Sequence, residues 1–325
     1  MRISVVITVF NEEESIGSLL DSLARQTKKL EELIIVDGGS TDDTVNIIEK
    51  NRGKFKKLRL FVKKGFPISR ARNFGIKRSN SEIIVSTDAG CFPHLDWFEQ
   101  ISTPFERKSI DVVSGFYDMT GRTVFQECIK PYFGVPRIKI KDDSFLPSAR
   151  SMAFRKYVWK EIGGFSERLD KAGEDTLFNY HATRSGYRYF FQEYALVDWE
   201  VPRNFSEAFE KFFSYAMGDY QTKIWWDYRK KFSTHTIKII SIYLRYLLFF
   251  LFLFLSLKKL MPFWVIMVLF FGYLAWSIQK NFFYIKLKGV KRFFIFALIP
   301  IIQVYSDFGV MLGFANGLWM ELLNR

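Results

Sequence analysis

The sequence predicts an α/β domain with a doubly wound, mostly parallel sheet, followed by an α-helical transmembrane region. Two observations support this class. In the first 90 residues, strand-like runs, the first of them β-branched and without charge, alternate four times with segments of helical period, as in a sheet with helices on both faces. After residue 205 the chain becomes rich in Phe and contains long apolar stretches with almost no charge, as membrane-spanning helices do.

The α/β domain is expected to begin with strands at residues 3–9, 33–36, 58–62 and 82–87, the first two of them buried, with helices between them at 15–25, from Thr44 onwards, and at 68–78. Asp37 follows the second strand and Asp88 follows the fourth. Ligands of an open α/β sheet bind just outside the carboxyl ends of its strands. Both carboxylates are therefore placed to meet a ligand, although Asp also ends many strands simply as a turn former.

We expect three parts in the chain: the α/β domain at 1–204, amphipathic interfacial helices at 205–236, and a transmembrane region at 237–325. In the middle part, aromatic residues recur at helical spacing from Phe205 onwards. This pattern is typical of a helix in a membrane interface, and equally of a helix packed on the globular domain. The apolar stretches that we expect to span the membrane are 239–257, 261–278 and 293–320, the third of them kinked or partly re-entrant.

Charged residues around these stretches predict how they are oriented. The loop 279–292 carries five basic residues and no acid, and loops of this kind stay on the cytosolic side. The α/β domain is therefore expected in the cytosol, held by a multi-pass anchor in the cell membrane. Asp307 interrupts the third apolar stretch, which makes it a candidate for function or for helix pairing. Alternatively, it lies at the edge of the span in contact with water.

The composition restricts the class of site. The net charge is +13, and residues 50–80 contain twelve Lys or Arg and no acid. Such a stretch suits nucleic acid, anionic lipid or a diphosphate, or is a solvated basic face. The two cysteines, Cys91 and Cys128, form no CxxC, and with three scattered His no zinc site can be built. This cysteine usage favours a reducing compartment.

Five spaced motifs carry a resemblance to a known family. They are VVITVFNE at 5–12, VDGGSTD at 36–42, ARNFGI at 71–76, TDAGC at 87–91 and GEDT at 173–176. In this order and spacing they resemble glycosyltransferase family 2 over about residues 1–205. The resemblance implies a GT-A fold, a nucleotide-sugar donor and inversion at the sugar carbon.

The resemblance also implies roles for residues on the donor side. Phe10, Glu12 and Asp37 would hold the nucleoside, and Asp37 can accept a hydrogen bond from a base N–H. Arg72 would lie near the donor diphosphate, where a guanidinium offers a bidentate fork to phosphate.

Asp88, followed by Ala89, matches the first carboxylate of the family's DxD element, which holds the ribose and a divalent cation. Mg²⁺ or Mn²⁺ is the expected cofactor because such cations favour oxygen ligands. The second carboxylate position is Gly90, so one expected ligand is missing. The cation would then be held by Asp88 and phosphate oxygens, with help from His94 or His181, or would not be essential.

The pair Glu174-Asp175 matches the acidic pair of the family in which the Asp is the general base. Inversion requires a carboxylate on the acceptor side to remove the hydroxyl proton as the oxygen attacks the anomeric carbon. We expect Asp175 to take this role and Glu174 to orient the site. The alternative is that the two acids merely begin a helix, where negative charge is favoured.

Weaker matches concern the acceptor side. The segment 147–151 with Arg150, together with Trp199 and Arg203, resembles segments near the acceptor site of membrane-tethered members. The stretch QTKIW at 221–225 stands where processive synthases carry QxxRW, but Ile224 replaces the Arg. Transfer of a single sugar is therefore favoured over polymerisation.

These features together predict an inverting glycosyltransferase of the hexosyltransferase type. It would move a sugar from a UDP- or GDP-sugar to a lipid-linked or glycan acceptor at the cytosolic membrane face, with membrane lipids as partners and no nucleic acid. The alternatives are a processive polysaccharide synthase, a family member that binds donor without transfer, and a non-catalytic basic protein that binds membranes or nucleic acid. The last of these would not explain why three Asp residues, at 37, 88 and 175, stand at expected element boundaries.

Overall fold

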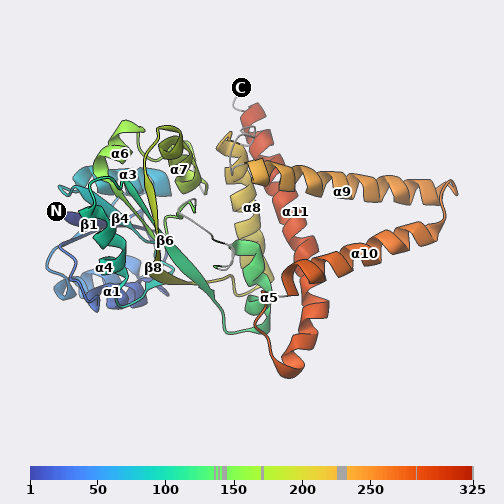
Figure 1. The fold of residues 1–325 in the computed structure, drawn as a ribbon, viewed down its shortest axis with the longest axis horizontal. Helices are drawn as coiled ribbons and strands as arrows, with labels where there is room; N and C mark the ends of the chain where they lie inside the picture. The colour runs from blue at the N-terminus through green and yellow to red at the C-terminus, as the bar shows by residue number, and fades with distance from the viewer. Residues whose placement is uncertain are drawn as a thin grey trace. The chain divides into compact units, whose positions relative to one another are not determined.

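The computed structural model describes residues 1–134, 137, 140, 145–169, 172–224, 233–282 and 284–323 (Figure 1). By its contacts the chain forms two compact units, Met1–Met119 with Ile138–Glu200 and Thr120–Arg137 with Val201–Arg325. The expected boundary after residue 204 stays a prediction. In the structure, the segment Thr120–Arg137 groups with the C-terminal helices.

The first unit is built on an eight-stranded sheet of order β3-β2-β1-β4-β7-β6-β8-β5. Its strands are β1 (Ile3–Val9), β2 (Glu32–Asp37), β3 (Leu58–Val62), β4 (Ile83–Ser86), β5 (Cys91–Pro93), β6 (Val112–Thr120), β7 (Met152–Arg155) and β8 (Tyr189–Glu200). Strand β1 pairs in parallel with β2 and β4, and β2 pairs in parallel with β3. The carboxyl ends of these four strands therefore share one edge, which is where the site is expected.

The other half of the sheet is antiparallel, with β7 paired to β4 and to β6, and β5 paired to β8. The predicted α/β class is thus confirmed, and the sheet is mixed rather than parallel throughout. The long strand β8 begins at Tyr189 and runs for 12 residues.

Helices cover the sheet of the first unit (Figure 1). They are α1 (Ile16–Ala24), α2 (Thr44–Lys50), α3 (Ile68–Arg78), α4 (Trp97–Ser102), α6 (Lys156–Glu161) and α7 (Glu174–Arg184), with the 3₁₀ turns η1 (Arg52–Lys54) and η2 (Thr103–Glu106). The Ile and Val residues of β1, β2 and β4 are buried, as expected for strands in the middle of such a sheet. Helix α3 can lie close on the sheet because residue 75 is a glycine. A Cβ at this position would lie only 2.7 Å from Val6 Cγ1.

The second unit is helical. It contains α5 (Val124–Phe133), α8 (Phe205–Gln221), α9 (Ser233–Leu257), α10 (Phe263–Phe282), η4 (Gly289–Phe293) and α11 (Phe294–Leu323). Helix α8 runs beside α11 (Figure 1), and three glycines of α11 face it, at 309, 313 and 317. A Cβ at Gly313 would lie 2.2 Å from the carbonyl oxygen of Phe213. The aromatic stretch from Phe205 onwards thus packs on α11 and α5, where Phe212 stacks on Phe133 at 4.6 Å.

Three helical segments are long and apolar enough to cross a membrane: Ile237–Leu257, Phe263–Phe282 and Gly289–Leu323. They overlap the three stretches expected from the sequence. Their side chains include many exposed Leu, Phe, Ile and Trp residues, which suits contact with lipid. Helix α11 continues through Pro300 over 30 residues as one element.

Asp307 lies among these segments and is only 1% exposed. Its carboxylate accepts hydrogen bonds from Arg245 Nη1 at 2.7 Å, from Tyr273 Oη at 2.8 Å and from Gln303 Nε2 at 2.8 Å. Arg245 belongs to α9, Tyr273 to α10 and Gln303 to α11 itself. Asp307 therefore pairs helices instead of meeting water at the edge of a span.

Candidate active site

The loop after β2 is organised by Asp37, which is fully buried. Its Oδ1 accepts hydrogen bonds from the backbone N–H groups of Gly39 at 2.7 Å and Ser40 at 2.8 Å, and its Oδ2 accepts from Ser40 Oγ at 2.5 Å. Gly39 has a φ of +100°, and a Cβ there would lie 2.8 Å from Lys64 Cα. Asp37 thus shapes the loop, and in this structure its carboxylate is already bonded within the chain.

The loops after β1 and β2 are joined by direct hydrogen bonds. The backbone N–H of Asn11 donates to Ser40 Oγ at 2.8 Å, and Asn11 Oδ1 accepts from the backbone N–H of Thr41 at 2.9 Å. The backbone N–H of Glu12 donates to Thr44 Oγ1 at 2.7 Å. Phe10 stands at this edge with 59% of its surface exposed. An exposed aromatic ring beside fixed loops can stack on a flat ring of a ligand.

Asp88 lies two residues after β4 and is partly open to solvent, with 35% of its side chain exposed. Ala89 behind it is buried. A Cβ built on Gly90 meets no atom within 4 Å, so the missing second carboxylate position is open space. The thiol of Cys91 is buried, and this burial, with the nearby charge of Asp88, raises its pKa to about 12. Cys91 is therefore an inert structural thiol.

Arg72 is the centre of the site. Its side chain is 2% exposed, its Nη1 donates to Glu174 Oε1 at 2.7 Å, and its Nη2 donates to Asp88 Oδ1 at 3.4 Å. The guanidinium also lies 5.0 Å from the ring centroid of Phe165. Burial lowers the pKa of Arg72, but the two carboxylates outweigh it and hold the pKa above its ordinary value. The guanidinium of Arg72, which is expected near the donor diphosphate, thus links the carboxylate of Asp88, just after β4, to that of Glu174, at the start of α7.

Helix α7 begins at the acidic pair. Gly173 supplies a left-handed residue with φ of 92° just before Glu174, which a side chain would disfavour. Burial raises the pKa of Glu174, and the charge of Asp175 adds to this, while Arg72 opposes both. The pKa of Glu174 is thus raised above its ordinary value, and Arg72 limits that rise. The two acids do start a helix, as the alternative proposed, and one of them is also tied to the centre of the site.

Asp175 connects α7 to the segment before β7. Its Oδ2 accepts a hydrogen bond from the backbone N–H of Ala149 at 3.0 Å, and its Oδ1 accepts from the backbone N–H of Thr176 at 2.7 Å. Arg150, which follows Ala149 in the sequence, stacks its guanidinium 4.1 Å from the ring centroid of Trp199. Asp175, Arg150 and Trp199 are thus brought to one region. Arg203 belongs to the second unit, where its backbone N–H donates to Glu207 at 2.9 Å.

Two residues that the sequence left without a role support this centre, one directly and one through its neighbour. Asn73, quoted in the ARNFGI motif, is buried and bonds the loop before α7 through Phe165. Phe165 itself packs under Arg72. In the sequence, the position of Asn73 next to Arg72 could have identified it as a site residue. No feature of the sequence around Phe165 distinguishes that residue.

The basic stretch 50–80 is partly neutralised by acids that lie elsewhere in the sequence. Arg52 pairs with Glu49 at 2.6 Å, Lys57 pairs with Glu32 at 2.7 Å, and Lys54 pairs with Asp21. These three basic side chains are about half exposed, but each is paired with an acid, and Arg72 is buried. The stretch is therefore less cationic than its sequence indicates.

A divalent cation would have few protein ligands here. In the part of the chain that the structure describes, no three His, Cys, Asp or Glu side chains gather closely enough to hold a metal. His94 lies 3.3 Å from Asp198, and His181 packs edge-on against Tyr180. Asp88, whose side chain is 35% exposed, fits a cation that takes most of its ligands from donor phosphates, as Mg²⁺ sites often do.

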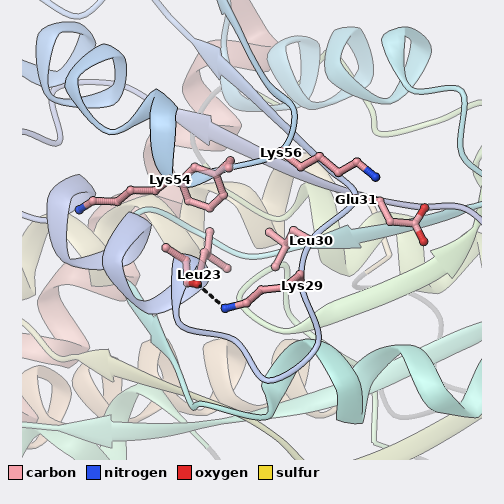
Figure 2. Close-up of a pocket in the computed structure, with 8 residues that line it drawn as sticks. Leu23, Lys29, Leu30, Glu31, Lys54 and Lys56 are labelled. Carbon is pink, nitrogen blue, oxygen red and sulfur yellow. Dashed lines mark hydrogen bonds between the residues drawn. The ribbon is translucent and has the colours of Figure 1, made fainter.

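A surface pocket of about 370 Å³ lies elsewhere on the first unit (Figure 2). Its walls include Leu23 at the end of α1, Leu30 just before β2 and Phe55 before β3, and Lys29 Nζ donates to the carbonyl oxygen of Ala24 at 3.0 Å. It is thus at the amino ends of the strands, away from the edge that carries Asp37 and Asp88. We do not assign it to the active site.

Comparison with known proteins agrees with the resemblance drawn from the motifs. The family model described as Glycosyl transferase family 2 matches residues 4–195. The chain belongs to this family. It is therefore a glycosyltransferase, with the α/β fold of the GT-A class followed by apolar C-terminal helices.

Two relatives and one solved structure illustrate the match. Glycosyltransferase AglE of Haloferax volcanii is 28% identical over 235 residues, which cover 69% of this chain and 74% of that protein. A dolichyl N-acetyl-alpha-D-glucosaminyl phosphate 3-beta-D-2,3-diacetamido-2,3-dideoxy-beta-D-glucuronosyltransferase of Methanococcus voltae is 23% identical over 205 residues, covering 58% of this chain and 63% of that protein. The mannosyltransferase PcManGT of Pyrobaculum calidifontis, solved with GDP-Man and Mn²⁺, aligns with a TM-score of 0.60 at 15% identity, over 99% of this chain and 87% of that chain. The last likeness concerns the fold alone.

Proposed function

We propose that this glycosyltransferase inverts the sugar carbon as it moves one sugar from a UDP- or GDP-sugar to a lipid-linked or glycan acceptor. The observation that supports this most is the position of Arg72. It donates to Asp88 at 3.4 Å and to Glu174 at 2.7 Å, so a donor-side carboxylate and the acid next to the proposed base flank one guanidinium. An inverting transfer needs these two sides to meet.

The donor would lie across the carboxyl ends of β1, β2 and β4. Phe10 would stack on the base, Glu12 and the loop ordered by Asp37 would hold the ribose and base edge, and Asp88 with Ala89 would face the diphosphate. A bound Mg²⁺ or Mn²⁺, held by Asp88 and the phosphates, would neutralise the charge of the leaving group. The complex of the distant relative PcManGT with GDP-Man and Mn²⁺ supports this class of donor and cofactor.

In the transfer itself, the acceptor oxygen attacks the anomeric carbon while the bond from that carbon to the diphosphate oxygen breaks. Asp175 takes the proton of the acceptor hydroxyl as the new bond forms. The hydrogen bonds from Ala149 and Thr176 hold its carboxylate in place. Glu174, which accepts a hydrogen bond from Arg72 Nη1 at 2.7 Å, orients the site beside Asp175. Arg150 on Trp199 would border the acceptor. Arg203, four residues after Trp199 in the sequence, keeps the acceptor-side role that the resemblance implies.

The acceptor is proposed to be lipid-linked or a glycan at the cytosolic membrane face. Three apolar helices support membrane association, and the dolichyl acceptor named for the Methanococcus voltae relative supports the lipid class. The basic residues of the 279–292 loop favour the cytosolic side. Of the QTKIW stretch, Trp225 lies outside the described residues, and Ile224 still argues against a processive synthase.

The test is turnover of a panel of UDP- and GDP-sugars by the full chain in detergent, with Mn²⁺, Mg²⁺ or EDTA. Asp175→Asn keeps the size of the side chain and one acceptor oxygen, and we expect it to lower turnover about 100- to 10,000-fold. The matched control is Asp21→Asn, which changes the same group in a surface pair with Lys54. Wild-type activity that Asp175→Asn leaves intact would refute the assignment of the base, and no turnover or binding of any donor would refute the proposed reaction.

A further inference from the structure

Asn73 on α3 uses the whole hydrogen-bonding capacity of its side chain. Its Oδ1 accepts from Trp159 Nε1 at 2.9 Å and from the backbone N–H of Phe165 at 3.0 Å. Its Nδ2 donates to the carbonyl oxygen of Phe165 at 2.8 Å and to Glu167 Oε1 at 3.0 Å. A buried amide with four partners of this kind fixes what it touches.

The partners of Asn73 form the connection that leads from α6 to α7. Trp159 lies on α6, and Phe165 and Glu167 lie in the loop that follows it. Gly164 has a φ of +81°, and a Cβ there would lie 2.9 Å from Asn73 Oδ1. The loop therefore lies directly on the amide of Asn73, at a distance that only glycine allows.

Phe165 connects the loop that Asn73 fixes to the residues of the site. Its ring is 1% exposed, lies 5.0 Å from the guanidinium carbon of Arg72, and stacks on Phe178 of α7 at 4.6 Å. A desolvated guanidinium over an aromatic face is held in one orientation. The same ring thus supports both Arg72 and the helix that begins with Glu174 and Asp175.

We propose that Asn73, acting through Phe165, is a positioning residue for glycosyl transfer. Asn73 fixes the backbone of Phe165, the ring of Phe165 holds Arg72 between Asp88 and Glu174, and α7 thereby keeps Asp175 in place. Asn73 touches neither donor nor acceptor. The inference rests on the proposed function, since it assigns a supporting role in that reaction.

The test compares Asn73→Asp with Gln26→Glu, both measured with the active donor. Asn73→Asp keeps the shape of the side chain. It replaces the hydrogen-bond-donating NH₂ group, which faces the Phe165 carbonyl oxygen and Glu167, with an oxygen that can only accept. Gln26 is also buried and donates to the carbonyl oxygens of Ser22 at 3.1 Å and His94 at 2.8 Å. Gln26→Glu therefore makes the same chemical change in the same unit, away from the loop before α7.

Both variants are expected to melt at lower temperature than the wild type. Only Asn73→Asp should also lower kcat, by about 100-fold, since small misplacements of a catalytic group cost this much. Its KM for the donor should change less than about threefold, because the hydrogen bonds of the Asn73 side chain go to Trp159, Phe165 and Glu167 and not to the loops that would hold the donor. The double variant Asn73→Asp with Glu167→Gln, which can restore one hydrogen bond of reversed direction, should regain about tenfold in kcat.

Phe165→Leu covers the case in which Asn73→Asp does not fold, because it removes the ring under Arg72 and leaves the backbone bonds to Asn73. It too should lower kcat with little change in donor KM. An active wild type whose kcat is unchanged by Phe165→Leu, or falls no more in Asn73→Asp than in Gln26→Glu, would overturn the positioning role. An inactive wild type would instead overturn the proposed function on which the role rests.

Discussion

Replacing Arg72 by glutamine removes the positive charge that faces Glu174. In the structure the two groups are 2.7 Å apart, and their side chains are 2% and 7% exposed. Removing one partner of a buried pair leaves the other charge without compensation, at a cost of about 3–5 kcal/mol in the free energy of unfolding. For a unit of this size, that loss lowers the melting temperature by roughly 10 °C.

The loss should depend on pH in a defined direction. Burial raises the pKa of Glu174 above its ordinary value, and Arg72 opposes this shift. At a pH between the ordinary pKa of a glutamate and the raised pKa of Glu174, the folded Arg72→Gln variant keeps a proton on Glu174 that the unfolded chain has released. The folded state of this variant therefore binds more protons than its unfolded state. Stability then falls as pH rises above the ordinary pKa of a glutamate. Arg72→Gln is therefore expected to lose more stability at pH 8 than at pH 5.

The assay is thermal unfolding of the full chain in detergent at pH 5 and pH 8. The matched control is Arg52→Gln, since Arg52 pairs with Glu49 at 2.6 Å but both side chains are nearly half exposed. Exposed pairs contribute about 0–1 kcal/mol, so the control should change little at either pH. The double variant Arg72→Gln with Glu174→Gln removes both charges, and should regain stability and lose the pH dependence. Equal losses in Arg72→Gln and Arg52→Gln, or a loss that is the same at both pH values, would refute the reasoning.

Two further predictions concern glycines. Gly90→Asp should fold normally because a Cβ there meets no atom within 4 Å, and it should make donor turnover more sensitive to EDTA by adding a second carboxylate beside Asp88; unchanged EDTA sensitivity in a folded variant would contradict this. Gly313→Ala should destabilise the second unit by roughly 1–3 kcal/mol, because the added methyl would lie 2.2 Å from the Phe213 carbonyl oxygen. Gly272→Ala on α10, where a Cβ has open space, is the control, and equal melting temperatures of these two variants in detergent would rule the packing argument out.

Local patterns in the sequence determined the class of the fold. The uncharged β-branched run Ile3–Val9 is typical of a strand buried on both faces of a sheet, and this strand was predictable with its ends. The strand Leu58–Val62 was also predicted with its ends, although it contains Arg59 and is only partly buried. The long apolar stretches likewise predicted the helices that can cross a membrane. Short elements such as α4 and β5 were not predicted, since six and three residues are too few to show a period. The antiparallel half of the sheet depends on pairing between distant segments, which no local pattern records.

For the site, the sequence by itself determined which residues gather at the carboxyl edge, because strand ends and turn residues are local features. The tertiary structure alone decided what these residues contact. Arg72 was expected beside phosphate, yet its buried guanidinium faces Asp88 and Glu174, which stand 16 and 102 residues away in the chain. In the same way, Asp307 acquires its partners from three helices. Charges separated so far along the chain are paired by packing, and their positions in the sequence carry no record of that pairing.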